Sequence, residues 1–496
     1  MSKKILIIGL DGVSWNVLNP MLENGYMPFL QDFIKKGKSG ILKSTEPPIT
    51  PTAWTSFQTG LPPEVHKIMG FRNFILKKGR LQSRILTSSS VSAKRIWDIL
   101  SENNRKLCLL NIPLTYPPFP INGFLVSGFP VPSTRCTFTY PEDFKDELLR
   151  TIPDFEVMQI GIGAKQKGMK IENIMGWWIK LISQKTKLTL YLLNKELWDV
   201  FMIHFQETDL LQHYLWHCID KSHPEHKPED FPKVAQFYST LDNKLSKIIA
   251  EARNKGFSTI IISDHGFQAC NCSFKANSWL FQKGYLVVNK NIKSDLISTL
   301  KKIFDLPRLY KLRSRIKQSK TKENITNQFL ESAINYEKSI VFMETNAVTN
   351  IAFAHFFSDD ARVIQKVLDD LDSLIFNGYK VINKIKKEIG KNNVYKIVFA
   401  DGVIASGTVP DDKPFFETPK PFGKLQLGVH HRDGIIIFDE TLKHLKLSEN
   451  IFDVPEIIMR LQDVPFTPSG ESKETDGLTT KESDEIENQL KGLGYL

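Results

Sequence analysis

Short, continuously apolar runs alternate along this chain with longer segments in which apolar residues recur at helical spacing. The apolar runs are rich in isoleucine, leucine and valine and lie at residues 4–10, 109–112, 199–205, 257–263 and 434–438. Helical spacing is clearest at residues 26–37, 93–102, 232–254 and 451–461. Strands that are apolar at every position are typical of sheets buried on both faces. The pattern therefore predicts an α/β fold, with a doubly wound, mostly parallel sheet and helices on both faces.

The spacing of these elements also predicts how the chain is divided. We expect residues 1–465 to form one α/β domain, because the predicted strands extend from the start of the chain to residue 438. A cap inserted at about residues 277–425 is predicted, since a helical segment and scattered strands interrupt the alternation there. Residues 466–496 begin with a polar, unpatterned stretch, which predicts a polar tail with a short terminal helix.

Composition and charge place the chain among globular proteins. It has 496 residues, 41% of them hydrophobic, and a formal net charge of +10. The excess of positive charge is local, because residues 301–325 hold nine Lys or Arg against only two acidic residues, Asp305 and Glu323. Such a cluster can meet a nucleic acid, a lipid headgroup or another polyanion, but the solvated face of a helix is the commoner explanation. We therefore do not expect a nucleic-acid partner.

Three sequence features predict a cytoplasmic protein. The apolar run at residues 5–10 ends at Asp11 and is shorter than the core of a signal peptide. No run reaches the roughly 18 apolar residues that a membrane-spanning helix needs. The nearest candidate, residues 188–205, is interrupted by three charged residues. The five cysteines are odd in number and irregular in spacing, which argues against a disulfide framework and suits a reducing compartment.

The tryptophan-rich segment at residues 175–198 raises the question of contact with a membrane surface. It combines Trp177, Trp178 and Trp198 with several lysines, a mixture found in helices that lie at a membrane interface. Packing of these rings into the core or the cap is the simpler interpretation. Membrane-surface contact is kept only as a subordinate hypothesis.

Polar side chains gather where the predicted strands end. Acidic and imidazole groups occur there at Asp11, at Asp209 with His213, at Asp264 with His265, and in "GVHHRDG" at residues 428–434. In open α/β sheets, ligands bind at the carboxyl ends of the strands. Asp209 and His213 are four residues apart, so on a helix both lie on one face.

Each of these groups has an ordinary explanation by itself, as a turn, a helix cap or a polar strand end. Together they predict a metal site, because crowded carboxylates repel one another and a divalent cation relieves that repulsion. The ligands on offer are oxygen and imidazole in separable groups. This set predicts two ions of zinc, or else of manganese or magnesium.

The segment "PPITPTAWTSFQTG", residues 47–60, places hydroxyl groups beside the first of these strand ends. Two metal ions roughly 3.5–4 Å apart are an established arrangement for in-line phosphoryl displacement. A hydroxyl fixed beside one metal becomes a nucleophile. Thr50, Thr52, Thr55 and Ser56 all qualify by residue type, and spacing alone does not choose among them.

The ordered motifs "LDG", "PPITPTAWTSFQTGLPPEVH", "ETDLLQH", "SDHG" and "GVHHRDG" resemble the alkaline phosphatase superfamily, in particular its type I phosphodiesterase/nucleotide pyrophosphatase branch. The resemblance implies that Thr50 is the nucleophile, with Thr52 and Thr55 as supporting hydroxyls. It implies one metal site at Asp11, Thr50, Asp264 and His265, and another at Asp209, His213 and His430. His431 and His66 match no ligand position, and we interpret both as structural.

These inferences predict a two-metal-dependent phosphoric ester hydrolase, more specifically a phosphodiesterase, that acts through a covalent phosphothreonine at Thr50. Its substrate would be a phosphorylated small molecule or headgroup, and zinc is the favoured metal. A phosphomutase with the same site is one alternative. A non-catalytic metal-binding module that docks to an acidic partner is the other.

Overall fold

The computed structural model describes most of the chain. The described residues are 2–77, 80–157, 171–223, 225–289, 333–388, 391, 393–407, 410–421, 426–470 and 478–493. The basic segment at residues 301–325 lies outside them. No helix among these residues is long and apolar enough to cross a membrane.

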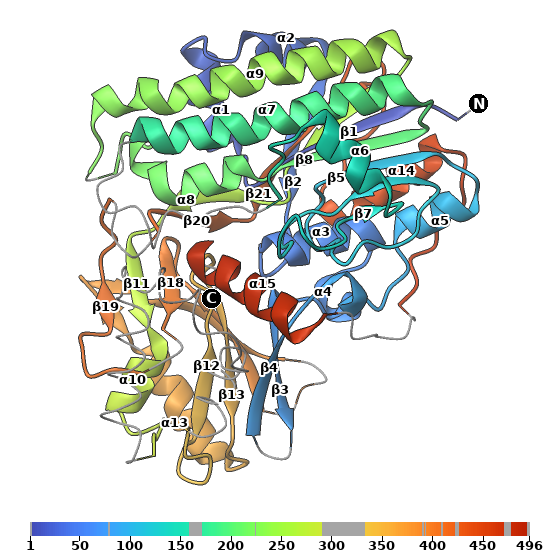
Figure 1. The fold of residues 1–496 in the computed structure, drawn as a ribbon. Coiled ribbons are helices and arrows are strands. Elements are labelled where there is room, and N and C mark those ends of the chain that lie inside the picture. The colour runs from blue at the N-terminus through green and yellow to red at the C-terminus, as the bar shows by residue number, and fades with distance from the viewer. Residues whose placement is uncertain are drawn as a thin grey trace, which may run out of the picture.

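A central sheet of eight strands confirms the predicted doubly wound α/β fold (Figure 1). Its strand order is β2-β21-β9-β1-β8-β5-β6-β7. The five inner strands β9, β1, β8, β5 and β6 run parallel, whereas β2, β21 and β7 pair antiparallel at the two edges. The strands are β1 (Ile5–Leu10), β2 (Lys38–Lys43), β5 (Leu107–Leu110), β6 (Gly123–Val126), β7 (Thr139–Tyr140), β8 (Val200–Phe205), β9 (Ser258–Ile262) and β21 (Asp433–Phe438).

Alternate residues of β1 face two hydrophobic layers, which explains why the whole strand is apolar. Leu6 and Ile8 belong to the layer under α1 (Trp15–Glu23), α2 (Pro28–Lys36), α6 (Phe144–Thr151), α7 (Ile171–Lys195), α8 (Glu207–Ile219) and α9 (Phe231–Asn254). Ile5 and Ile7 belong to the layer under α3 (Thr50–Thr59), α5 (Ile96–Glu102) and α14 (Val454–Leu461). Helices therefore cover both faces of the sheet, as the continuous apolar pattern predicts.

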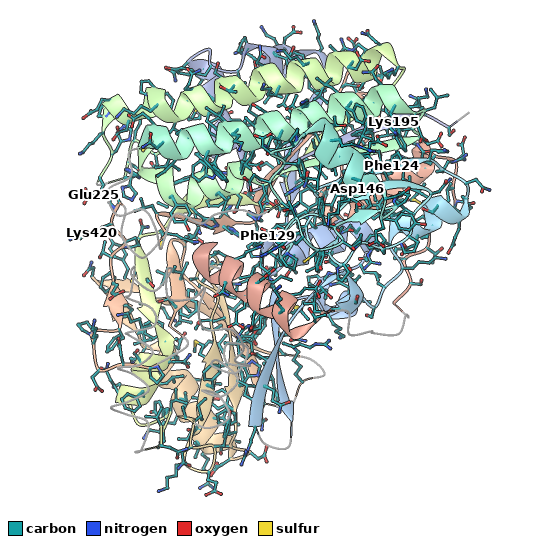
Figure 2. The ribbon with its side chains drawn as sticks, in the orientation of Figure 1. Phe124, Phe129, Asp146, Lys195, Glu225 and Lys420 are labelled. Atoms are coloured by element: carbon teal, nitrogen blue, oxygen red, sulfur yellow. The ribbon has the colours of Figure 1, made fainter. Side chains whose placement is uncertain are left out.

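The tryptophan-rich segment belongs mainly to the long helix α7, which packs against α9 over the sheet (Figure 1). Trp178 and Trp198 are 1% and 2% exposed and lie in the larger hydrophobic layer. At the C-terminal end of α7, the Lys195 ammonium lies 5.8 Å from the ring centroid of Phe124 on β6 (Figure 2). Packing in the core therefore accounts for these two tryptophans.

A second, smaller part of the molecule lies below the central sheet in Figure 1. It is built on the antiparallel sheet β12-β13-β17-β16, with a three-stranded sheet β18-β11-β19 beside it. Its elements are α10 (Ala276–Gln282), α13 (Ala361–Asp372), β11 (Cys272–Lys275), β12 (Val341–Glu344), β13 (Ile351–Phe356), β14 (Ile375–Phe376), β15 (Tyr379–Lys380), β16 (Ile382–Lys387), β17 (Val394–Phe399), β18 (Val403–Ser406) and β19 (Phe416–Glu417). We call this part the cap. The hairpin β3 (Arg72–Lys77) and β4 (Arg80–Ile85) extends from the main domain toward it.

The C-terminal helix α15 (Thr480–Leu493) lies between the main domain and the cap (Figure 1). Ile486 and Leu490 are fully buried in the larger hydrophobic layer. Gln489 donates to the carbonyl oxygens of Val131 and Pro132 at 2.6 and 3.1 Å. The segment for which we predict a polar tail with a short terminal helix thus carries a helix, and that helix has a buried apolar face.

Candidate functional site

The seven residues predicted as nucleophile or metal ligands converge at one end of the parallel strands. Asp11 follows β1, Asp264 and His265 follow β9, and Asp209 and His213 lie in the first two turns of α8, which follows β8. Two further elements complete the cluster. Thr50 is the first residue of α3, and His430 lies on β20 (Gly428–His431), which pairs with β10 (Gly266–Ala269). All seven side chains are fully buried: Asp11, Thr50, Asp209, His213, Asp264, His265 and His430.

One half of the cluster surrounds the Thr50 hydroxyl. Thr50 Oγ1 lies 3.4 Å from Asp11 Oδ1 and 3.3 Å from His265 Nε2. His265 Nε2 in turn lies 3.2 Å from Asp264 Oδ2. The ligand atoms of Asp11, Asp264 and His265 all fall within 4.8 Å of one another. A hydroxyl, two carboxylates and an imidazole therefore meet at one point.

The other half of the cluster joins Asp209 to two imidazoles. Asp209 Oδ1 lies 3.4 Å from His213 Nε2 and 3.1 Å from His430 Nε2, and the two Nε2 atoms are 3.0 Å apart. Each ring presents its other nitrogen, Nδ1, to a backbone carbonyl, Gly428 for His213 and Pro48 for His430, both within 2.9 Å. Because Nδ1 carries the proton in that arrangement, both Nε2 atoms direct lone pairs at the carboxylate.

This donor set fits a bound cation. An oxygen and two ring nitrogens that face one another with lone pairs repel, and a metal ion turns that repulsion into coordination. In the other half, Asp264 Oδ2 has no hydrogen-bond partner among the described residues. The oxygen and imidazole ligands match those that zinc accepts, and they also suit manganese.

The pKa values of the three carboxyl groups also indicate that a cation binds at this cluster. Burial, followed by the charges of Asp264 and Asp209, raises the pKa of Asp11 well above its usual value. Burial and the charge of Asp209 likewise raise the pKa of Asp264. Burial acts in the same direction on Asp209, but His213 and His430, when protonated toward it, outweigh burial and hold the pKa of Asp209 well below its usual value. Positive charge at the cluster would favour the ionised form of all three carboxylates.

Sequence reasoning missed two side chains that hold Asp11 in place. His204 Nε2 lies 2.8 Å from Asp11 Oδ2, and Trp54 Nε1 donates to the same oxygen at 3.3 Å. Burial, and then the charge of Lys185, lowers the pKa of His204 well below its usual value, so the neutral ring donates its Nε2–H. The two rings meet edge to face with centroids 4.9 Å apart. Asp11 therefore uses Oδ2 for support and presents Oδ1 to Thr50.

Gly9 makes this support possible. A Cβ at Gly9 would lie 2.7 Å from a ring atom of Trp54 and 3.0 Å from one of His204. The sequence indicates a role for His204 only indirectly, because a histidine in an otherwise apolar strand is usually a core residue whose hydrogen bonds are satisfied there. Only the parallel pairing of Gly9 with His204 brings that ring beside the end of β1.

The remaining hydroxyls and histidines of the predicted motifs have other partners. Thr55 Oγ1 donates to the Pro51 carbonyl at 2.6 Å. His66 Nε2 lies 2.9 Å from Ser56 Oγ, which is a structural contact. The Asp433 backbone N–H donates to Nδ1 of His431 at 3.2 Å. Thr52 Oγ1 is buried and has no hydrogen-bond partner among the described residues. Of the four candidate nucleophiles, Thr50, Thr52, Thr55 and Ser56, it is Thr50 that contacts the carboxylate cluster.

Comparisons with known proteins agree with the fold and with the motifs. A family model described as "Type I phosphodiesterase / nucleotide pyrophosphatase" matches residues 5–400. Phosphonoacetate hydrolase from Sinorhizobium meliloti 1021, in complex with phosphonoformate, is similar with a TM-score of 0.58 and 15% identity, over 93% of this chain and 96% of its own. No curated protein matches the sequence.

Murine ectonucleotide pyrophosphatase/phosphodiesterase 5 is also similar, with a TM-score of 0.52 and 14% identity, over 95% of this chain and 98% of its own. An inactive threonine-to-alanine variant of that murine protein, in complex with AMP, gives a TM-score of 0.52 and 13% identity over 95% and 97%. The family resemblance inferred from the motifs is confirmed by the family model. Because its match ends at residue 400, His430 lies beyond the matched region.

Proposed function

This chain belongs to the type I phosphodiesterase/nucleotide pyrophosphatase family of metal-dependent phosphoester hydrolases, and on that premise we propose that it hydrolyses phosphodiesters through a phosphothreonine at Thr50. One observation carries the proposal. Thr50 Oγ1 lies within 3.4 Å of both Asp11 Oδ1 and His265 Nε2, at the N-terminus of α3. A hydroxyl in that position is directed at the ligand cluster and at the positive end of a helix dipole.

The proposed ligand sets divide the cluster in two. Asp11, Thr50, Asp264 and His265 would hold one divalent cation, and Asp209, His213 and His430 would hold the other. Bound there, divalent cations lower the pKa of a coordinated hydroxyl and neutralise charge that develops on phosphoryl and leaving oxygens. Zinc is the proposed metal, because it accepts both carboxylate oxygen and imidazole nitrogen, and manganese is the alternative.

The chain's own groups account for the remaining steps. The N–H groups of Thr50 and Thr52 lie in the first turn of α3, where they have no acceptor within the helix, so they could bind a phosphoryl oxygen; Pro51 between them has no N–H. Thr50 Oγ gives up its proton and forms a bond to phosphorus while the ester P–O bond opposite it breaks, and the departing oxygen takes up a proton. Water then cleaves the phosphothreonine, which restores the Thr50 hydroxyl and releases the phosphoryl product.

Similar proteins support a phosphorylated small-molecule substrate. Phosphonoacetate hydrolase binds phosphonoformate, and an inactive threonine-to-alanine variant of murine ectonucleotide pyrophosphatase/phosphodiesterase 5 binds AMP. These ligands differ in size and share a phosphoryl or phosphonyl group. We therefore propose a phosphodiester of a small molecule or headgroup as the substrate of this chain.

A substrate screen tests the proposed reaction. Purified protein supplied with zinc or manganese should hydrolyse bis-p-nitrophenyl phosphate faster than p-nitrophenyl phosphate or a phenylphosphonate ester. Chelation should remove the activity and added metal should restore it. Activity that persists in excess chelator, or that is confined to the monoester, would contradict a metal-dependent phosphodiesterase.

His204 provides a separate test of how Asp11 is held. We expect His204→Leu to weaken metal binding about 10–100-fold, because partners that orient a ligand contribute about that much to affinity. His204→Gln keeps an N–H donor and should retain more of the affinity. Metal titration by calorimetry and metal content after dialysis measure the effect without relying on turnover. Equal affinity in the leucine variant and the parent protein would show that His204 only fills space.

A further inference from the structure

Lys185 is the one lysine among the described residues whose side chain is buried. It lies on α7, in the layer of helices that covers one face of the central sheet, and its side chain is 6% exposed. Burying an ammonium group is costly unless its charge is paired and its N–H groups have acceptors. The partners of Lys185 therefore indicate its role.

The ammonium group of Lys185 joins the end of a strand to the start of a helix. Its Nζ lies 2.8 Å from Glu207 Oε1 and 3.0 Å from Glu207 Oε2. It also donates to the backbone carbonyl oxygen of His204 at 3.3 Å. Glu207 is the first residue of α8 and is fully buried, and His204 is the last residue but one of β8. The contacts of one cation thus fix where α8 begins relative to the end of β8.

The helix that Lys185 holds carries two residues of the metal-ligand cluster. Asp209 lies two residues after Glu207, and His213 follows one helical turn later on the same face of α8. Both belong to the proposed ligand set of Asp209, His213 and His430, which we call the second metal site. Its third ligand, His430, lies on a different element, β20. A displacement of α8 at its first turn would therefore change the distances between the ligands of this site.

Two neutral side chains hold the first turns of α8 to the end of β1. Thr208 Oγ1 donates to the Asp11 carbonyl oxygen at 2.7 Å, and Gln212 Nε2 donates to the Gly12 carbonyl oxygen at 3.0 Å. Lys185 reaches the same region from α7, and its bond to a carboxylate is charge-assisted. Such bonds are stronger than those between neutral groups. We therefore expect Lys185 to constrain the start of α8 more strongly than either neutral side chain.

An ion pair at this buried position needs an explanation beyond packing. Two apolar residues of similar volume would often give equal or greater stability, because they avoid the desolvation of two charges. An ion pair instead fixes a direction, because the N–H groups of the ammonium must face the carboxylate oxygens. A metal site needs that precision, since the partners behind its ligands determine how tightly an ion is held.

We propose that Lys185 is a positioning residue for the second metal site, because it holds the first turn of α8, and with it two of the three ligands, in register with β20. The inference rests on the proposed function and on the ligand set given there. It adds a residue that touches neither the metal nor the substrate.

The direction of the effect distinguishes positioning from electrostatics. Removing the ammonium alone leaves the Glu207 carboxylate two residues from Asp209, and an added negative charge by itself would strengthen the binding of a cation. Misplaced ligands would weaken it. A positioning role for Lys185 therefore predicts lower metal affinity where a purely electrostatic role predicts higher affinity.

Lys185→Met tests the proposal through metal binding rather than turnover. In calorimetric titration with Mn²⁺, we expect one of the two ions to bind about 10–100-fold more weakly than in the parent protein. Electron paramagnetic resonance is a second readout, because two Mn²⁺ ions held close together couple and give a spectrum unlike that of a single ion. The coupled spectrum should be reduced at metal concentrations that saturate the parent. Unchanged or tighter binding of both ions would overturn the proposal.

A combination with Asp209→Asn identifies the ion that is affected. That variant is expected to lose the ion of the second metal site, so the remaining ion reports on the other ligand set. Adding Lys185→Met to Asp209→Asn should leave the affinity of the remaining ion unchanged. A further loss as large as in Lys185→Met alone would contradict a role confined to the second metal site.

A paired substitution separates positioning from stability. Lys185→Met with Glu207→Met removes both charges and leaves two apolar side chains, so it should recover stability that the single variant loses. Because the link to α8 is still missing, metal affinity should stay low while thermal unfolding of the metal-free protein returns toward that of the parent. Recovery of metal affinity together with stability would show that the pair serves folding alone. The paired variant also decides the question if Lys185→Met does not fold.

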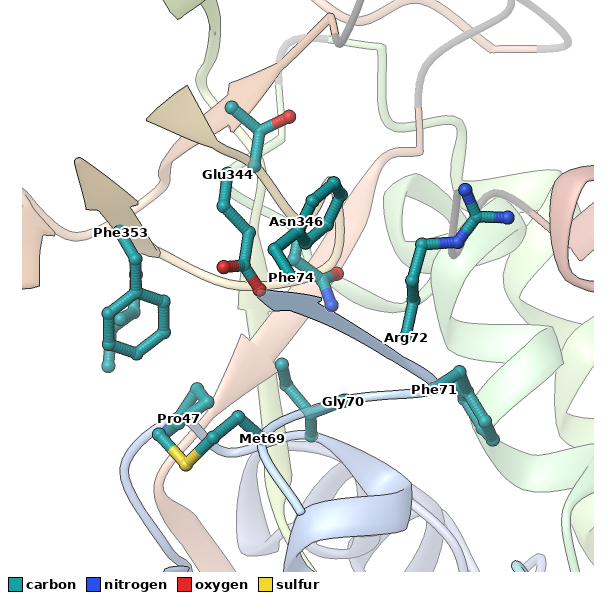
Figure 3. A pocket seen from close by; sticks show the side chains of 12 residues that line it. Pro47, Met69, Gly70, Phe71, Arg72, Phe74, Glu344, Asn346 and Phe353 are labelled. Atoms are coloured by element: carbon teal, nitrogen blue, oxygen red, sulfur yellow. The ribbon is translucent and has the colours of Figure 1, made fainter. Parts of the chain in front are cut away.

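A second buried ion pair provides the matched control. Arg72 Nη2 lies 3.1 Å from Glu487 on α15, and both side chains are less than one-tenth exposed. Figure 3 shows Arg72 beside a pocket between the main domain and the cap, and none of the seven cluster residues lines that pocket. Arg72→Met should therefore lower stability but leave the affinity of both ions unchanged. An equal loss of metal affinity in Arg72→Met and Lys185→Met would indicate a general effect of destabilisation and refute the positioning role.

Failure of the proposed function gives a different result in the same titrations. A parent protein that bound fewer than two ions would show that the ligand sets are wrong, and the role of Lys185 would fall with them. A parent that binds two ions, with Lys185→Met binding both equally well, would refute the role of Lys185 and leave the ligand sets intact.

Discussion

Replacing Thr50 by alanine is expected to abolish turnover of every phosphodiester that the protein accepts. The substitution removes the oxygen that bonds to phosphorus, so a whole covalent step is lost, and we expect kcat to fall by at least about 10³-fold. The six other cluster residues remain, so most of the metal affinity should survive. Steady-state kinetics and metal content, measured on the same preparation, check both parts of the prediction.

Two neighbouring variants serve as controls for Thr50→Ala. Thr50→Ser keeps a hydroxyl at the same place and should retain measurable turnover. Thr52→Ala removes a buried hydroxyl that has no hydrogen-bond partner among the described residues, so it should alter kcat and stability little. Full activity in Thr50→Ala, or loss of activity in Thr52→Ala alone, would show that the nucleophile has been assigned to the wrong residue.

Asp209→Asn should have the second-largest effect, through the loss of a metal ion. Asparagine has nearly the same shape as aspartate, but it removes the negative charge that faces the Nε2 atoms of His213 and His430. We expect the metal content to fall from about two ions per chain toward one, and kcat to fall by about 10²-fold or more. Elemental analysis after dialysis, together with kinetics at saturating metal, measures both quantities.

Asp32→Asn is the matched control for the charge change. Asp32 forms an exposed ion pair with Lys36 on α2, where both side chains are more than half exposed, so its loss should leave metal content and kcat unchanged. Unchanged metal content in Asp209→Asn would contradict the second ligand set. Excess zinc that fully restored kcat in that variant would show that Asp209 tunes affinity without being required for the reaction.

The central sheet was predictable from sequence because its inner strands are buried on both faces. Ile5 and Ile7 pack on one side of β1 and Leu6 and Ile8 on the other, so each position had to be apolar. That physical requirement leaves a direct mark on the sequence. The convergence of Asp11, Asp209 and Asp264 was predictable for a related reason, because parallel strands end at the same edge of a sheet.

The support of Asp11 was not predictable in the same way. It depends on the register that sets His204 beside Gly9 and on the packing of Trp54 over both. Neither leaves a periodic signal. The ion pair between Arg72 and Glu487 joins the first strand of a hairpin to the last helix of the chain, and nothing local in either sequence indicates the other. Contacts made between distant elements are decided by tertiary packing, which a pattern of single residues does not record.

Rapid acid quench with a phosphorus-labelled diester, followed by peptide mapping, tests the central claim most directly. Acid stops the reaction while the covalent intermediate is present, and phosphothreonine survives the quench. The proposed mechanism predicts label on the peptide that contains residues 47–60, localised by fragmentation to Thr50, and none in Thr50→Ala. Label on Thr52, Thr55 or Ser56, or rapid turnover with no labelled protein at any quench time, would contradict it.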